Sequence, residues 1–126
     1  MGYEHTPAEI YPALLKAFNA GDIDATVACY EPEAYFVLKS GHAIRGAAEL
    51  REMFRARFSY KPDLKLDVRK IISAGDDLVL VVVEWTTETV SSSGDVKVLA
   101  GTATDIARRQ PDGTWKLALD NPYGVE

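Results

Sequence analysis

Residues 99–121, with the sequence LAGTATDIARRQPDGTWKLALDN, constrain the fold of this chain most strongly. Two runs of strand-forming residues flank a Pro-Asp-Gly turn at residues 111–113, and this pattern predicts a long antiparallel hairpin. Each predicted strand carries one aspartate among small or apolar neighbours, Asp105 in the first and Asp120 in the second. A carboxylate in such a strand either faces water or needs a partner in the core. The placement of these two side chains therefore decides whether the chain has a reactive pocket.

The register of this hairpin follows from its turn, which places opposite each other residues whose numbers sum to about 223–225. Side chains alternate between the two faces of a strand, so an odd sum puts both aspartates on one face. That face would hold Gly101, Ala103, Asp105, Ala118 and Asp120. The opposite face would hold packing residues, namely Ile106, Trp115, Leu117 and Leu119. A shift of one residue would separate the carboxylates, so both arrangements stay open.

Composition and charge exclude several classes of function. The net charge of −5 argues against a nucleic-acid partner, because phosphate binding needs clustered lysine and arginine. The single cysteine, Cys29, allows no intrachain disulfide. The two histidines, His5 and His42, lack the spacing of metal ligands, so no metal site is expected. No leader or membrane span is recognisable in the sequence, and we expect a cytoplasmic protein with no membrane partner.

The first half of the chain is predicted to be mainly helical. Thr6 and Glu9 have the spacing of a capping box, which predicts a helix that begins at Pro7 and is ended by Gly21. Asp22 is a suitable cap for a second, short helix. The elements expected after this cap are a helix at 23–30, a strand at 34–39, a loop at 40–42 and a helix at 46–59.

The second half is predicted to be sheet. Apolar and charged residues alternate from Leu64 to Val68, and turn residues recur at 74–77 and 91–95. The expected strands are 64–72, 78–90, 96–109 and 115–121. No repeat or linker interrupts this order, so residues 1–126 are predicted to form one α+β domain. Helices gathered on one face of a strongly curved sheet would enclose a cone-shaped cavity.

Three stretches carry a resemblance to a known superfamily. They are AFNAGDIDATVACYEPEAYF, HAIRGAAELREMF and DIARRQPDGTWKLALDNPYG, in that order. Together they resemble the NTF2-like superfamily and, within it, the SnoaL-like and ketosteroid-isomerase-like proteins. The resemblance implies a cone-shaped fold with three N-terminal helices packed on a strongly curved, mostly antiparallel sheet. It does not imply one activity, because the superfamily includes isomerases, cyclases, epoxide hydrolases, dehydratases and non-catalytic binding domains.

The functional residues of these relatives carry over only in part. The ketosteroid isomerases place a base on the first strand and a tyrosine on the first helix, and these positions fall on Leu38 and Leu14. Only their aspartic acid on the penultimate strand has a match, Asp105. Because leucines replace the base and the tyrosine, steroid isomerisation by that mechanism is not expected. The SnoaL-type cyclases use an aspartate near Asp120. The limonene-epoxide-hydrolase branch uses an aspartate on each of the last two strands with an arginine between them, and the arginine position here is Ala103.

We hypothesise that Asp105 and Asp120 form a catalytic acid/base pair that needs no cofactor and that raises the pKa of Asp105. The expected ligand is a small apolar molecule, aromatic or polyketide-like, held in the cone. Its expected contacts are Leu14, Phe18, Phe36, Leu38, His42, Phe54, Phe58, Trp85, Ala103 and Asn121. We also expect a homodimer that forms through the outer face of the sheet, where Glu84 is predicted to lie.

Other interpretations remain open at this point. Either aspartate could cap backbone amides or pair with an arginine such as Arg45. His42 could be an exposed loop residue without a role, and the aromatic residues could be core packing alone. The domain could also be a non-catalytic binding module whose cavity is filled by Leu14, Leu38 and Phe54. An oligomerisation domain of the kinase-association type is a third possibility.

Overall fold

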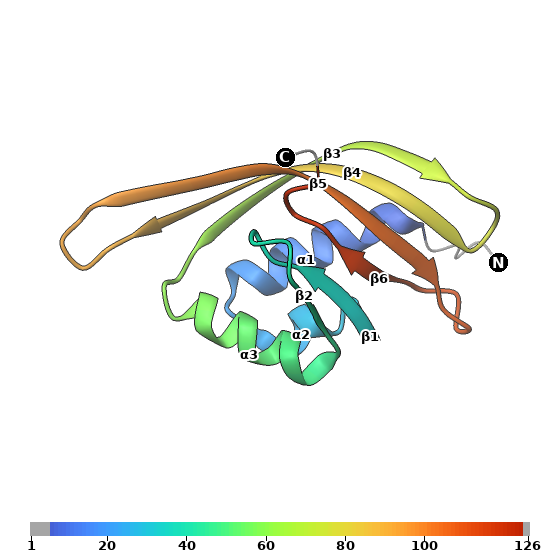
Figure 1. Ribbon diagram of the computed structural model, residues 1–126, viewed down its shortest axis with the longest axis horizontal. Coiled ribbons are helices and arrows are strands. Elements are labelled where there is room, and N and C mark those ends of the chain that lie inside the picture. Colours follow the sequence, from blue (N-terminus) through green and yellow to red (C-terminus); the bar gives the residue numbers. More distant parts are fainter. Residues whose placement is uncertain (1–5, 125–126) are drawn as a thin grey trace.

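The structure is a computed structural model that describes residues 6–124, so His5 lies outside the described residues. Six strands form one curved sheet in the order β2-β1-β6-β5-β4-β3. The helices gather on the concave side of this sheet (Figure 1). Neighbouring strands are antiparallel except β1 and β6, which are parallel. This arrangement confirms the predicted α+β cone.

The helices begin and end close to the predicted points. A 3₁₀ turn, η1 (Pro7–Glu9), leads into α1 (Ile10–Asn19), which is followed by α2 (Ile23–Val27) and later by α3 (Ala47–Phe58). The predicted capping box is wrong, because Thr6 makes no side-chain cap, and its carbonyl oxygen accepts from the Glu9 N–H at 3.0 Å instead. The Asp22 cap is confirmed, since its Oδ1 accepts from the Ala25 N–H at 3.0 Å.

The strands include one that the sequence did not predict. Their bounds are β1 (Tyr30–Val37), β2 (Ala43–Arg45), β3 (Asp63–Ser73), β4 (Leu78–Val90), β5 (Val96–Arg109) and β6 (Trp115–Asp120). The short strand β2 was missed, and β1 begins at Tyr30 rather than at residue 34. Tyr30 pairs with Leu117 of β6, and the register of this pairing shifts before it resumes at Tyr35. The shift accommodates Pro32, which has no N–H to donate to a ladder.

The final hairpin combines both registers that the sequence allowed. Ile106 lies opposite Leu119, whereas the next pair towards the turn is Ala107 with Leu117, so β6 has one extra residue at this point. A β-bulge of this kind changes which face the following side chains occupy. Leu117 is consequently fully buried on the concave side, and the prediction that it shares the opposite face with Leu119 is wrong.

The core lies between the helices and the concave face of the sheet. Alternate residues of β4, namely Val79, Val81 and Val83, are buried there together with Leu50 and Phe54 of α3. Towards its far end the β4–β5 hairpin extends beyond the helices (Figure 1). The β5 residues there, from position 96 to 100, are exposed. No helix within residues 6–124 is long and apolar enough to cross a membrane.

Candidate functional site

Asp105 and Asp120 lie on the adjacent strands β5 and β6, and both point towards the helices. Their side chains are almost withdrawn from solvent, since Asp105 is 3% exposed and Asp120 is 8% exposed. Both residues line one pocket between the sheet and α1. Sequence reasoning left this placement open, and the structure brings the two carboxyls together on the concave face.

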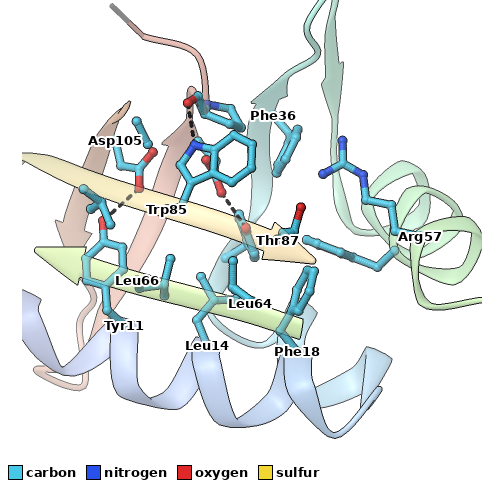
Figure 2. Close-up of a pocket in the computed structure, with 16 residues that line it drawn as sticks. Tyr11, Leu14, Phe18, Phe36, Arg57, Leu64, Leu66, Trp85, Thr87 and Asp105 are labelled. Atoms are coloured by element: carbon cyan, nitrogen blue, oxygen red, sulfur yellow. Dashed lines mark hydrogen bonds between the residues drawn. The ribbon is translucent and has the colours of Figure 1, made fainter. Parts of the chain in front are cut away.

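Asp105 receives two hydrogen bonds from different elements. The hydroxyl of Tyr11, on α1, donates to its Oδ2 at 2.9 Å, as Figure 2 shows. The backbone N–H of Asn121, which directly follows β6, donates to its Oδ1 at 3.2 Å. These contacts hold the carboxyl group between the helix and the last strand.

Asp120 has a phenol partner of its own. The hydroxyl of Tyr30, at the start of β1, donates to its Oδ2 at 2.6 Å. Tyr30 is itself buried in the core. Each aspartate is therefore fixed by one tyrosine from the N-terminal third of the chain.

Burial and mutual repulsion raise the pKa of Asp105 well above its ordinary value. Burial also raises the pKa of Asp120, although the hydrogen bonds from Tyr30 and Asp105 and the charge of Arg57 oppose this rise. Two carboxyls this close in an apolar pocket do not ionise independently. Asp105 is therefore the carboxyl that holds its proton more tightly, and Asp120 is the one that ionises more readily.

The two phenols remain protonated donors. Burial, followed by the negative charge of Asp105, raises the pKa of Tyr11. Burial, followed by the charge of Asp120, also raises the pKa of Tyr30. Both hydroxyls are thus protonated near neutral pH and can donate hydrogen bonds to the aspartates.

The pocket around the aspartates has a volume of about 80 Å³. A dry cavity of about 150 Å³ is known to hold one benzene molecule, so this deep pocket accepts only a fragment of an organic ligand. Its wall consists mainly of apolar and aromatic side chains: Tyr11, Leu14, Phe18, Tyr30, Phe36, Phe54, Arg57, Leu64, Leu66, Val83, Trp85, Thr87, Ala103, Asp105, Asp120 and Pro122.

A wider hollow adjoins the deep pocket, and we call it the vestibule. It has a volume of about 480 Å³ and is lined by Phe18, Arg57, Tyr60, Pro62, Trp85, Thr87, Thr89, Lys97, Leu99 and Tyr123. Four of these residues, Phe18, Arg57, Trp85 and Thr87, also line the deep pocket. The two hollows therefore form one site, of which only the vestibule is as large as a typical ligand pocket.

Trp85 belongs to the walls of both the deep pocket and the vestibule. Its indole N–H donates to the carbonyl oxygen of Pro122 at 2.7 Å, which ties β4 to the segment after β6 (Figure 2). Gly101 lies opposite Trp85 in the β4–β5 ladder. A Cβ at Gly101 would lie 2.9 Å from Cζ2 of Trp85, so only glycine leaves room for the indole in this position.

Six of the ten expected ligand contacts line the deep pocket, and four do not. The six are Leu14, Phe18, Phe36, Phe54, Trp85 and Ala103. Leu38 packs against the core outside the pocket wall, and His42 is exposed. Both residues belong to a tight turn after β1, in which the Leu38 N–H donates to the His42 carbonyl at 2.8 Å. Neither residue is part of the deep pocket wall.

The other two expected contacts have structural roles. Phe58 packs edge-on against Phe18, with ring centroids 4.9 Å apart, and lies behind the pocket wall. The Asn121 side chain donates to Oγ1 of Thr104 at 3.2 Å, so only the backbone of Asn121 reaches Asp105. Arg45 is also remote from the aspartates, since it pairs with Glu33 at 3.5 Å.

Sequence reasoning missed four polar residues of the pocket, Tyr11, Tyr30, Arg57 and Thr87. A signal for Tyr11 existed, because it precedes Leu14 and Phe18 at helical spacing and so shares their buried face. Tyr30 was assigned to a helix but begins a strand. Arg57 is exposed, yet it also lines the deep pocket. The position at which the resemblance implied an arginine holds Ala103, on β5 two residues before Asp105.

Comparison with known proteins gives one family match and several solved structures with the same fold. The family model described as "SnoaL-like domain" matches residues 12–118. No curated protein matches the sequence.

Within the described residues, no group of three or more metal-ligating side chains is present.

Several solved structures have the same fold. A ketosteroid isomerase-like protein from Erwinia carotovora is 22% identical, with a TM-score of 0.80 and coverage of 95% of both chains. An NTF2-like protein of unknown function from Shewanella oneidensis is 18% identical, with a TM-score of 0.77 and coverage of 90% of this chain and 92% of that one. An NTF2-like superfamily protein from Salmonella enterica is 19% identical, with a TM-score of 0.76 and coverage of 94% and 89%.

Proposed function

Because this chain belongs to the SnoaL-like domain family and buries a carboxyl pair, we propose that it performs acid/base chemistry on a small organic ligand. The ligand is largely apolar, as the pocket wall is, and the chemistry needs no cofactor. One observation carries the proposal: Asp105 and Asp120 share one apolar pocket, and each is held by its own tyrosine. Such pairs of carboxyls with separated protonation states are typical of proton-transfer sites.

The two aspartates have different proposed roles. Asp120, as the carboxylate, removes a proton from a carbon next to a ligand carbonyl. Asp105, as the acid, donates its proton to the carbonyl oxygen, which gives the neutral enol. Return of a proton to a different carbon, or attack of the enol carbon on a second carbonyl, completes an isomerisation or a cyclisation. The Tyr11 hydroxyl, already within 2.9 Å of Asp105, would help to position that acid.

A test of this step needs no knowledge of the natural ligand. The probe is 4-phenyl-2-butanone, whose methyl-ketone end suits the deep pocket and whose ring suits the vestibule. Proton NMR in D₂O follows the incorporation of deuterium next to the carbonyl. We expect the protein to accelerate this exchange and D105N and D120N each to reduce it about 100-fold or more, the usual contribution of general acid/base catalysis.

The control variant is D76N, which removes a carboxylate that is exposed in the turn between β3 and β4. It should exchange the probe at the wild-type rate. Exchange no faster than in buffer, or equal exchange by wild type and D120N, would reject the catalytic role of the pair.

A second candidate function is ligand binding without catalysis. The observation that favours it is the small volume of the deep pocket, into which Leu14 and Phe54 both project, although Leu38 does not. On this view the probe binds in the vestibule and shifts amide signals in NMR spectra, but its exchange is not accelerated. The same experiment therefore separates the two functions.

We also propose that the protein forms a homodimer through the outer face of the sheet. Three apolar residues lie side by side on that face, since Ile72 pairs with Leu80 and Leu80 pairs with Ile106. Ile72 is exposed, and Leu80 and Ile106 are half-buried. Light scattering after size exclusion should give a dimer mass for the wild type and a monomer mass for L80E. A monomeric wild type would reject the proposal.

A further inference from the structure

We propose that the ligand carries a carboxylate or a similar anionic group, which binds Arg57 and Lys97 in the vestibule while its apolar part reaches the deep pocket. The inference rests on the proposed function, because it names the class of molecule that the same site would take. It is argued from the ion pairs of the chain, from the composition of the vestibule and from the charge of the deep pocket.

Arg57 differs from every other arginine in the described part of the chain. The other six, Arg45, Arg51, Arg55, Arg69, Arg108 and Arg109, each pair with a carboxylate. Arg57 has no such partner between residues 6 and 124, and its guanidinium carbon lies 5.0 Å from the centre of the Phe36 ring. Figure 2 shows it reaching from α3 to the pocket wall. A guanidinium placed there without a partner can accept an anion as a bidentate ligand.

Lys97 provides a second cation from the opposite side of the vestibule. It lies on β5, in the part of the β4–β5 hairpin that extends beyond the helices, whereas Arg57 lies on α3. No carboxylate pairs with Lys97 among residues 6–124. The vestibule wall contains these two cations and no acidic side chain, although the chain as a whole has a net charge of −5. A local positive site on an acidic protein attracts anionic ligands.

The rest of the vestibule suits an apolar or aromatic body. The Trp85 and Tyr123 rings meet edge to face, with centroids 5.4 Å apart. Leu99 and Pro62 add apolar surface. Lys39 lies outside this wall, with Nζ 5.4 Å from the centre of the Tyr123 ring, and adds positive charge close by. A ligand held at one end by cations and along its length by aromatic rings would enter the deep pocket with its uncharged end.

The charge of the deep pocket favours this orientation. Asp120, the more readily ionised carboxyl of the pair, places negative charge inside the deep pocket, and this charge repels an anionic group. Arg57 lines both hollows and can therefore bind an anionic group that stays in the vestibule. The anionic end is expected in the vestibule, and the reacting carbonyl is expected in the deep pocket.

The test uses two probes that differ only in charge, 4-(3-oxobutyl)benzoate and 4-(3-oxobutyl)benzamide. Both carry the methyl ketone of the first probe, and dissociation constants come from NMR titration at pH 7.5 and low salt. We expect the wild type to bind the benzoate about tenfold or more tightly than the amide, the range of a charge-assisted hydrogen bond. R57Q and K97Q should each reduce this preference, and the double variant should remove it.

The matched control is R55Q, which lies two positions away on α3 and removes an arginine that pairs with Glu52. It should keep the preference for the benzoate. Equal affinities of the wild type for both probes, no measurable binding of the benzoate, or a preference that survives in the double variant would overturn the proposal. D120N should bind the benzoate at least as tightly as the wild type, because it removes a repelling charge. Binding preference is thus read independently of deuterium exchange, so the two proposals can fail separately.

Discussion

The Tyr30 hydroxyl lies 2.6 Å from Oδ2 of Asp120, and both side chains are buried. Tyr30 is the first residue of β1, and Asp120 is the last residue of β6. These two strands pair in parallel, so the hydrogen bond joins distant parts of the chain at the middle of the sheet. It also stabilises the charged form of Asp120, because a donor to a carboxylate favours ionisation.

Replacement of this donor should affect both the pKa of Asp120 and stability. In Y30F the Asp120 carboxylate loses its phenol partner, so its pKa rises and the free energy of unfolding falls by about 1–3 kcal/mol. Carboxyl carbon shifts in a pH titration report the first effect, and urea denaturation reports the second. The control is Y35F, since Tyr35 is exposed. Equal carboxyl titrations in wild type and Y30F would contradict the assignment.

Stability should decrease as pH rises above about 4, near the ordinary pKa of an aspartate. The raised pKa of Asp105 means that the folded protein holds this proton more tightly than the unfolded chain. The free energy of unfolding therefore declines with increasing pH until Asp105 ionises, by at most about 1.4 kcal/mol per pH unit for one proton. Urea denaturation between pH 4 and pH 8 measures this slope. D105N should flatten it and D76N should not, and an unchanged slope in D105N would contradict the raised pKa.

A methyl group at Gly101 should displace Trp85. The 2.9 Å approach that a Cβ would make leaves no space, so in G101A the indole must move and weaken its hydrogen bond to Pro122. We expect altered near-ultraviolet circular dichroism and a fall in the affinity of the site for 4-phenyl-2-butanone. A100S, at the exposed neighbouring position, serves as the control. Wild-type spectra and affinity in G101A would show that the indole is not held as described.

Enlarging the deep pocket should separate stability from ligand binding. L14A and L50A each remove a buried leucine, at a cost of about 2–5 kcal/mol in the free energy of unfolding. Only Leu14 lines the deep pocket, so L14A alone should bind 4-phenyl-2-butanone more tightly. Thermal denaturation and NMR titration measure the two effects. Tighter binding by L50A, or weaker binding by L14A than by wild type, would place the ligand elsewhere.

The bounds of β4 and β5 were predicted more accurately from the sequence than the start of β1. Residues 78–90 and 96–109 are rich in β-branched and apolar residues and lie between turns rich in glycine and aspartate or serine, and the structure confirms these strands at their predicted bounds. Tyr30 was misassigned because its spacing from Ile23 and Val27 also fits a helix. Its pairing with Leu117, far along the chain, determines its conformation, and local periodicity contains no information about that contact.

The candidate site could be predicted only in outline. Two aspartates in apolar strands indicated a pocket, but their common face depended on the bulge beside Ala107, which no turn motif reveals. The unpartnered Arg57 could not be distinguished from Arg55 by helical position alone, since both occur on a charged helix. Only the positions of the surrounding carboxylates separate them.

The position of β6 within the sheet also determines when the sheet can be completed during synthesis. Of the six strands described, β6 is the last in chain order, yet it lies between β1 and β5 rather than at an edge. Until it leaves the ribosome, β1 has only the three-residue β2 beside it and exposes a free edge to other chains. A nascent chain that has not yet released β6 should therefore pair with other chains more readily than the complete sheet does.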